Sequence, residues 1–142
     1  MNRFATPVLL FLAASLAHAS GPVAPDGWDG VSGSVLPDGQ PCCIPADLNG
    51  TGLVGGAFVL VSNNKEEFGL FALAYIPPLK ARWQLLEKHP VSLLPAYRVS
   101  VEPPGQFPFG SIKACTTATD CIQYFASSAS GHFKPATSVD ER

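Results

Sequence analysis

The sequence predicts a mainly β protein: one antiparallel β-sheet or sandwich domain of about six to eight short strands, disulfide-linked and preceded by a Gly/Pro-rich arm. Short segments rich in β-branched and aromatic residues alternate with turn-forming Gly, Pro and Asn. The 13 Gly and 14 Pro interrupt any long helix. No internal repeat and no long amphipathic helical pattern occurs, so the segments agree on one β architecture.

The first residues have the pattern of an export signal. Arg3 supplies a short positive start, Pro7–Ala17 is an apolar run too short to span a bilayer, and Ala17-His18-Ala19 is a small-x-small cleavage site. We therefore expect residues 1–19 to be a signal peptide and the protein to be periplasmic or secreted. The residue directly after the cleavage site is Ser20 rather than a cysteine, and no later stretch is apolar enough to span a bilayer, so we expect no membrane anchor after cleavage.

The segment that follows, residues 20–46, is predicted to be a loop-like arm. Ten of its twenty-seven residues are Gly or Pro, which favours neither a long helix nor a central strand. Trp28 is the residue able to anchor the arm, and we expect it to cover an apolar patch of the core. The remainder, residues 47–142, is predicted to be the β-rich domain.

A hairpin follows the arm. Gly56–Ser62 is short, β-branched and aromatic, and it is bounded by Gly and by Asn63-Asn64, which is typical of a buried strand. Phe68–Tyr75 has the same character and is its natural antiparallel partner across the polar turn 63–67. These two segments predict the centre of the sheet.

The third apolar segment, Arg82–Lys88, begins after Pro77-Pro78. It alternates imperfectly, because Trp83, Leu85 and also Leu86 are apolar. We expect a third strand that completes a meander. A short helix over Lys80–Lys88 is the alternative, because Gln, Leu, Glu and Lys are good helix formers.

The second half of the chain predicts further short strands. Leu93–Glu102 alternates apolar and polar residues and is expected to have one wet face. Residues 106–115 are irregular and aromatic, which suits an edge strand or an extended loop on the sheet. Ile122–Ala126 is expected to be another strand, residues 127–131 a turn, and His132–Ser138 a short closing strand.

The cysteines are an even set in an exported chain, so we expect disulfides. Three connectivities are open. A bridge between the two neighbouring cysteines strains the peptide between them, whereas the later pair brackets a polar loop that a hairpin could close. We favour two long crosslinks that join the start of the domain to this loop. The cysteines are Cys42, Cys43, Cys115 and Cys121.

One loop has the spacing of a calcium site. Asp47, Asn49 and Thr51 occupy positions one, three and five of such a loop, and Gly52 occupies the position of the sharp turn. Only Asp47 carries a carboxylate, which is too little charge for tight calcium binding unless distant acids contribute. We expect a structural turn in which Asp47 and Asn49 accept backbone N–H bonds, and no cofactor.

A catalytic constellation is hard to assemble from the sequence. His89 precedes a proline and His132 follows a glycine, so both are expected in exposed loops, and no serine lies in a nucleophile-elbow sequence. Glu66-Glu67 is expected to be a solvated turn. We therefore expect no enzymatic activity. A small hydrolase would need a cleft that holds His89 or His132 within hydrogen-bond reach of an acid or a serine.

The charge balance limits the classes of partner. Nine Lys and Arg face eleven Asp and Glu, and removal of the leader with Arg3 leaves eight against eleven. No basic run occurs, so neither nucleic acid nor an anionic membrane surface is an expected partner. An acidic protein suits a basic protein partner through electrostatic complementarity.

Four short motifs carry a resemblance. They are the D-x-N-x-x-G loop that leads into an apolar strand, the G-L-F-A-L strand, the I-x-Y-F strand, and the final H-F-K-P. Over residues 47–138 the chain resembles small uncharacterised envelope proteins of Gram-negative bacteria. More distantly it is similar to periplasmic lysozyme inhibitors of the invertebrate-lysozyme-directed type and to immunity proteins against secreted peptidoglycan hydrolases.

This resemblance implies an exported, non-enzymatic binding domain that blocks the cleft of a basic envelope hydrolase with an exposed loop. By position, the candidate loops are the turn 63–67 and a serine-rich segment. An alternative is a structural envelope module that packs against a larger assembly through an exposed apolar patch at Val101–Phe109. The candidate partner-binding residues of the serine-rich segment are Ser127, Ser128, Ser130 and His132.

Overall fold

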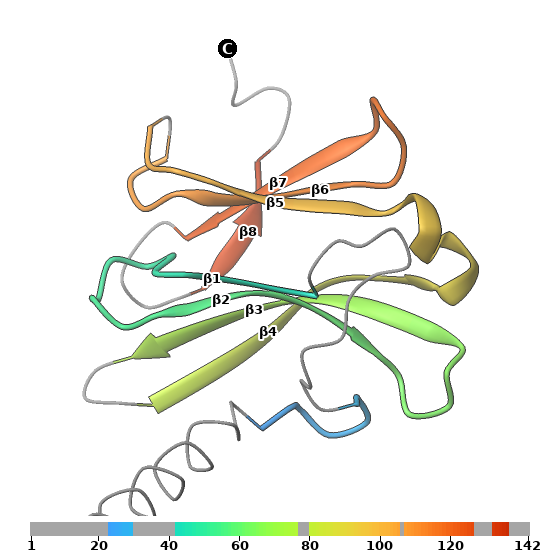
Figure 1. Ribbon diagram of the computed structural model, residues 1–142. Coiled ribbons are helices and arrows are strands. Elements are labelled where there is room, and N and C mark those ends of the chain that lie inside the picture. Colours follow the sequence, from blue (N-terminus) through green and yellow to red (C-terminus); the bar gives the residue numbers. More distant parts are fainter. Residues whose placement is uncertain (1–22, 30–41, 77–79, 106, 127–131, 137–142) are drawn as a thin grey trace, which may run out of the picture.

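The protein is mainly β, as the sequence predicts. The computed structural model describes residues 23–29, 42–76, 80–105, 107–126 and 132–136, and it has two antiparallel four-stranded sheets that face each other (Figure 1). The predicted signal peptide and the serines of the candidate segment lie outside the described residues. Within the described part of the chain, no helix has the length and apolar composition needed to cross a membrane.

Each sheet is a meander in which neighbouring strands follow one another along the chain. A 3-10 helix, η2 (Val91–Ala96), connects the two sheets. The first sheet consists of β1 (Cys43–Ala46), β2 (Gly55–Val61), β3 (Glu67–Ile76) and β4 (Lys80–Pro90). The second sheet consists of β5 (Arg98–Glu102), β6 (Ser111–Cys115), β7 (Cys121–Ala126) and β8 (Phe133–Pro135).

The main core fills the space between the sheets. Because side chains alternate along a strand, Phe68, Leu70 and Ala72 of β3 face inward, and Ile112 and Tyr124 meet them from the second sheet. The side chain of Gln84 on β4 also joins the sheets: it donates to the carbonyl oxygen of Phe133 at 2.7 Å and accepts from its N–H at 2.8 Å. The amide thereby satisfies backbone groups of the edge strand β8.

The outer face of the first sheet carries a second, aromatic cluster. Phe58, Phe71 and Trp83 meet there edge to face, and Trp28 packs against Phe71 with ring centroids 5.0 Å apart. The indole N–H of Trp83 donates to the carbonyl oxygen of Val23. The segment 23–29 thus covers this face, which is the role expected of Trp28. Strands β2 and β3 are consequently buried on both faces and form continuous apolar runs.

The predicted meander in the first half of the chain is confirmed. The strands expected at Gly56–Ser62 and Phe68–Tyr75 are β2 and β3, and Lys80–Pro90 is a strand rather than the alternative helix. The arm contains one element that the composition did not predict. Cys43–Ala46 forms β1, an edge strand on β2, where Pro45 is tolerated because an edge strand has one free side.

Two predictions for the second half are wrong in part. The strand expected at Leu93–Glu102 begins only at Arg98, because residues 91–96 form η2, which contains Pro95. The irregular segment expected at 106–115 ends in β6, a central strand between β5 and β7. Phe107, from the same segment, stacks on Phe125 at a centroid distance of 4.4 Å.

The expected long crosslinks are also wrong. Cys42 pairs with Cys43 and Cys115 pairs with Cys121. The second pair forms because β6 and β7 place Cys115 and Cys121 directly opposite each other, with Cα atoms 4.0 Å apart. The tight turn 116–120 therefore determines the pairing, and each disulfide stays within its own part of the fold.

A β-bulge in β4 decides which of its side chains face the core. The register against β3 shifts between Leu70 and Phe71, so that Glu87 lies opposite Leu70 while Leu85 lies opposite Phe71. Leu86 is the extra residue, and it reverses the alternation for the rest of the strand. Glu87 and His89 consequently face the space between the sheets.

We predict that Gly55→Ala destabilises the fold by about 3 kcal/mol. A Cβ atom on Gly55 would lie 1.8 Å from the backbone oxygen of Leu73, so β2 and β3 would have to separate. Urea unfolding measures the change. Gly105→Ala is the matched control, since a Cβ atom there would lie 4.0 Å from the oxygen of Pro103, and equal stability of the two variants would contradict the prediction.

Candidate functional site

The candidate site is built around the carboxylate of Glu87, which the bulge directs between the sheets. Tyr97, at the start of the second sheet, donates its hydroxyl to Oε1 of Glu87 at 2.5 Å. Tyr124 on β7 donates to Oε2, also at 2.5 Å. The side chain of Glu87 is 12% exposed, so these charge-assisted bonds offset much of the cost of removing the carboxylate from water.

His89 is the third neighbour of this carboxylate. Its Nε2 lies 3.1 Å from Oε1 of Glu87, and its ring packs beside the rings of Phe68 and Tyr97. The side chain is 25% exposed, so one side of the imidazole remains open to water. The expectation of an exposed loop residue is therefore wrong for His89, which lies on β4 beside an acid.

Both phenols are held in the neutral, donating form. Burial raises the pKa of Tyr97 above its ordinary value, and the hydrogen bond to Glu87 and the negative charge of Glu87 raise it further. The same causes, burial first, raise the pKa of Tyr124. The two hydroxyls therefore act as donors that orient the carboxylate of Glu87.

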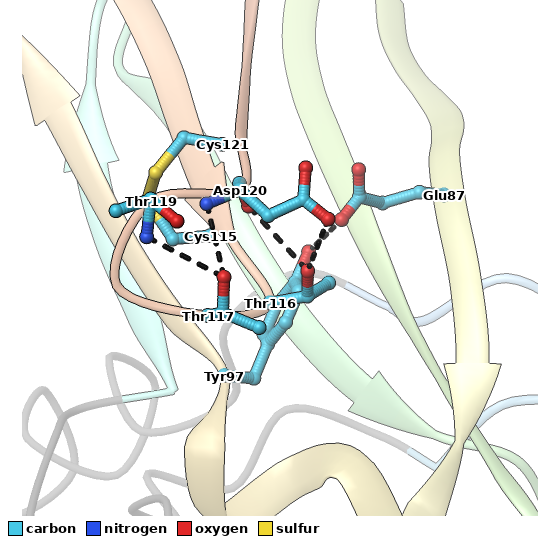
Figure 2. The surroundings of a disulfide bond; sticks show 8 residues. All are labelled: Glu87, Tyr97, Cys115, Thr116, Thr117, Thr119, Asp120 and Cys121. Carbon is cyan, nitrogen blue, oxygen red and sulfur yellow. Dashed lines mark hydrogen bonds between the residues drawn. A yellow bond between two sulfur atoms is a disulfide. The ribbon is translucent and has the colours of Figure 1, made fainter.

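A cavity of about 190 Å³ opens beside this carboxylate. Figure 2 shows the side chains of Glu87 and Asp120 turned toward the same space, with Thr116 near the carboxylate of Asp120. The wall is apolar on the inner face of the second sheet and polar at the turn between β6 and β7. The lining residues are Glu87, His89, Ala114, Thr116, Asp120 and Ile122.

The turn 116–120, which we call the hairpin loop, closes this cavity and is held rigidly. The disulfide between Cys115 and Cys121 joins its two ends. Within the loop, the N–H of Thr116 donates to the carbonyl oxygen of Asp120, and the hydroxyl of Thr117 accepts from the N–H groups of Thr119 and Asp120. A second, shallower depression of about 390 Å³ lies beside it, lined by Ala96, Arg98, Cys115, Thr117 and Ala118.

The Asp47 loop is a hydrogen-bonded turn. Both carboxylate oxygens of Asp47 accept backbone N–H bonds, from Gly50 and Thr51 on one oxygen and from Gly52 on the other. Asn49 is buried and donates its side-chain N–H to the carbonyl oxygen of Tyr75, rather than accepting a bond as expected. Among the described residues, no group of three or more His, Cys, Asp or Glu is arranged to hold a metal ion.

The other sequence-predicted residues do not gather into one site. His132 is exposed and directly precedes β8, whereas the serines that come shortly before it in the chain lie outside the described residues. Residues 63–66 of the polar turn are exposed, Glu67 is half-buried at the start of β3, and Lys65 forms an ion pair with Asp29. Glu66 is likewise exposed.

Reasoning from the sequence did not identify Glu87, Tyr97, Tyr124 or the hairpin loop as a site. The two adjacent apolar residues Leu85-Leu86 interrupt the alternation and indicate a bulge. The bulge turns Glu87 toward the space between the sheets. The hairpin loop was visible only as a polar segment between two cysteines.

Three comparisons with known proteins found no similar protein. No protein-family model matches the chain, and neither a curated protein nor a solved structure is significantly similar to it.

We predict that Tyr97→Phe makes the free energy of unfolding fall less steeply as the pH rises into the alkaline range. Above about pH 10 the unfolded tyrosine loses its proton while the folded one keeps it. The unfolded state then binds fewer protons, so the free energy of unfolding falls as pH rises. Each protected tyrosine contributes up to about 1.4 kcal/mol per pH unit.

Urea unfolding at a series of pH values from neutral to alkaline measures this slope. The variant is expected to be less stable by about 2 kcal/mol at neutral pH, because a hydrogen bond to a charged group is lost, but to have the shallower alkaline slope. Tyr75→Phe is the control, because Tyr75 lies on the outer face of the first sheet, away from Glu87. Parallel curves for wild type and Tyr97→Phe would contradict the prediction.

Proposed function

We propose that the protein is an exported, non-enzymatic binding domain that recognises a basic hydrolase of the cell envelope, such as a lysozyme, and inhibits it. The observation that carries this proposal is the hairpin loop, an exposed turn that is closed by a disulfide and braced by its own hydrogen bonds. This loop replaces the serine-rich segment and the turn 63–67 as the proposed contact with the partner.

Preorganisation is the physical reason for choosing this loop. A binding loop that is ordered before it meets its partner loses less conformational entropy on association than a flexible one. Residues 117–120 are exposed, whereas the flanking cysteines are partly buried and belong to paired strands. The loop is therefore presented to solvent in one conformation on a rigid two-stranded support.

Charge favours a basic partner. The chain carries a formal net charge of −2, and Asp120 lies in the hairpin loop itself with the carboxylate of Glu87 behind it. Complementary charge across an interface accelerates encounter and disfavours acidic competitors. The leader pattern and the two disulfides support export to an oxidising compartment.

The structural-module alternative receives less support. A structural module would require the aromatic side chains of Val101–Phe109 to form an exposed apolar patch. Phe107 instead stacks on Phe125, and Phe109 packs against the core beside Gly50. Their apolar surface is used within the chain.

A small hydrolase is the second candidate, because one observation favours it. His89 and Glu87 are within hydrogen-bond distance of each other beside a cavity, which is the arrangement that such an enzyme would need. The carboxylate of Glu87 already accepts hydrogen bonds from two phenols and lies 3.1 Å from Nε2 of His89, however, which makes it a better orienting group than a base.

We predict that the protein slows purified muramidases, including lysozymes of the invertebrate type, in a cell-wall clearing assay. Ala118→Arg in the hairpin loop is expected to weaken inhibition and direct binding at least tenfold, because it adds bulk and positive charge at the contact. Val54→Arg, at a position 60% exposed elsewhere on the surface, is the matched control and should leave both unchanged. Absence of binding and of inhibition for every muramidase would overturn the proposal.

The hydrolase candidate makes a different prediction. If Glu87 and His89 are catalytic, the protein alone should cleave peptidoglycan or a chromogenic ester or glycoside, and His89→Gln should abolish the activity while leaving the fold intact. We expect no turnover above that of His89→Gln. A rate that depends on His89 would establish the enzyme and contradict the non-enzymatic proposal.

A further inference from the structure

We propose that the cavity beside Glu87 is a receptor for one cationic side chain, a lysine or an arginine, supplied by the protein partner. This inference deepens the proposed function and rests on it for the identity of the partner, but the binding chemistry belongs to the cavity alone. Four properties of the cavity carry it: its apolar wall, its fixed negative charge, its free acceptors and its size.

The apolar wall suits the aliphatic part of such a side chain. Ala114 and Ile122 lie opposite each other on β6 and β7 and face the inside of the sandwich. Ala114 is buried, but Ile122 is 43% exposed although it belongs to the inward-facing row. The methylene groups of a lysine or arginine would cover this apolar surface while the charged end lies elsewhere.

The charged end would meet a negative group that is fixed in place. Tyr97 and Tyr124 hold the Glu87 carboxylate from both of its oxygens. A carboxylate has about four acceptor positions. Oε1 accepts from Tyr97 and faces His89, whereas within the described residues Tyr124 is the donor to Oε2, which leaves acceptor capacity on Oε2 for a cationic donor.

A second set of acceptors lies on the hairpin loop. Asp120 is exposed and contributes its carboxylate to the cavity, and the hydroxyl of Thr116 lies 3.5 Å from Oδ2 of Asp120. Glu87 and Asp120 come from different sheets and approach the same space (Figure 2). Two carboxylates on opposite walls match the several N–H donors of a guanidinium or an ammonium group.

Among the described residues, the lining of this cavity includes neither a lysine nor an arginine, and Arg98 lines the neighbouring depression. Within the described part of the chain, the salt-bridge partner of Glu87 is His89, while Lys88 is directed to the other face of β4 and pairs with Glu67. The cavity of about 190 Å³ has room for roughly six water molecules, which is enough for one long side chain and too little for a larger ligand.

The test uses the protein without any partner. Tripeptides with blocked ends, glycyl-lysyl-glycine and glycyl-arginyl-glycine, are titrated while the methyl NMR signals of Ala114 and Ile122 are followed. We expect saturable shifts with a millimolar dissociation constant. The same peptides with norleucine or citrulline, which keep the length but lose the charge, are expected to bind at least tenfold more weakly.

Asp120→Asn is expected to weaken binding of the arginine peptide about fivefold, and Glu87→Gln at least tenfold. Asp120 is exposed, so Asp120→Asn keeps the test decisive even if Glu87→Gln fails to fold. Glu66→Gln, in the exposed turn 63–67, is the matched control and should change nothing. Equal shifts with norleucine, or undiminished binding by Asp120→Asn, would overturn the inference.

The outcome separates this inference from the proposed function. Cationic peptides that bind in the cavity of a protein that inhibits no muramidase would support the receptor and overturn the lysozyme partner. Muramidase inhibition by a protein whose cavity binds no cationic peptide would overturn the receptor and leave the hairpin loop as the contact.

Discussion

The hydrogen bonds to the largely buried carboxylate of Glu87 are the interaction on which, in our account, the arrangement of the two sheets depends. It belongs to the first sheet, but both of its phenolic donors, Tyr97 and Tyr124, come from the second half of the chain. A carboxylate removed from water is costly unless its oxygens are hydrogen-bonded, and here Tyr124 on β7 and Tyr97, which directly precedes β5, supply these bonds. The apolar core favours contact between the two sheets but is not directional. The hydrogen bonds of Glu87 are directional, and in our account they favour one position of the second sheet relative to the first.

The relative position of the two sheets determines which residues line the cavity beside Glu87. The bulge at Leu86 turns Glu87 and His89 inward, and the second sheet brings the hairpin loop over them. The Gln84 amide makes a similar connection to Phe133 at the edge strand β8. Polar groups at two places thus join the sheets, and the proposed receptor cavity lies at the first of them, under a loop that its disulfide holds in place.

Much of the fold can be predicted from local sequence patterns, whereas much of the candidate site cannot. The hairpin of β2 and β3 is predictable because its apolar runs are bounded by Gly and Asn. The start of β5 was missed because residues 91–96 carry an apolar pattern that the 3-10 helix, with Pro95, does not use as a strand. The site was missed for a different reason: Glu87 and Tyr124 are 37 residues apart, and the face on which Glu87 lies depends on the register of β4 against β3.

The most direct test of this account is a double-mutant cycle between Glu87 and Tyr124. The free energy of unfolding is measured by urea denaturation for the wild type, Glu87→Gln, Tyr124→Phe and the double variant. Because the two side chains are in contact across the sheets, the account predicts a coupling energy of about 1 to 3 kcal/mol. Changes that simply add, with coupling below about 0.5 kcal/mol, would show that the carboxylate does not join the sheets and would contradict the account.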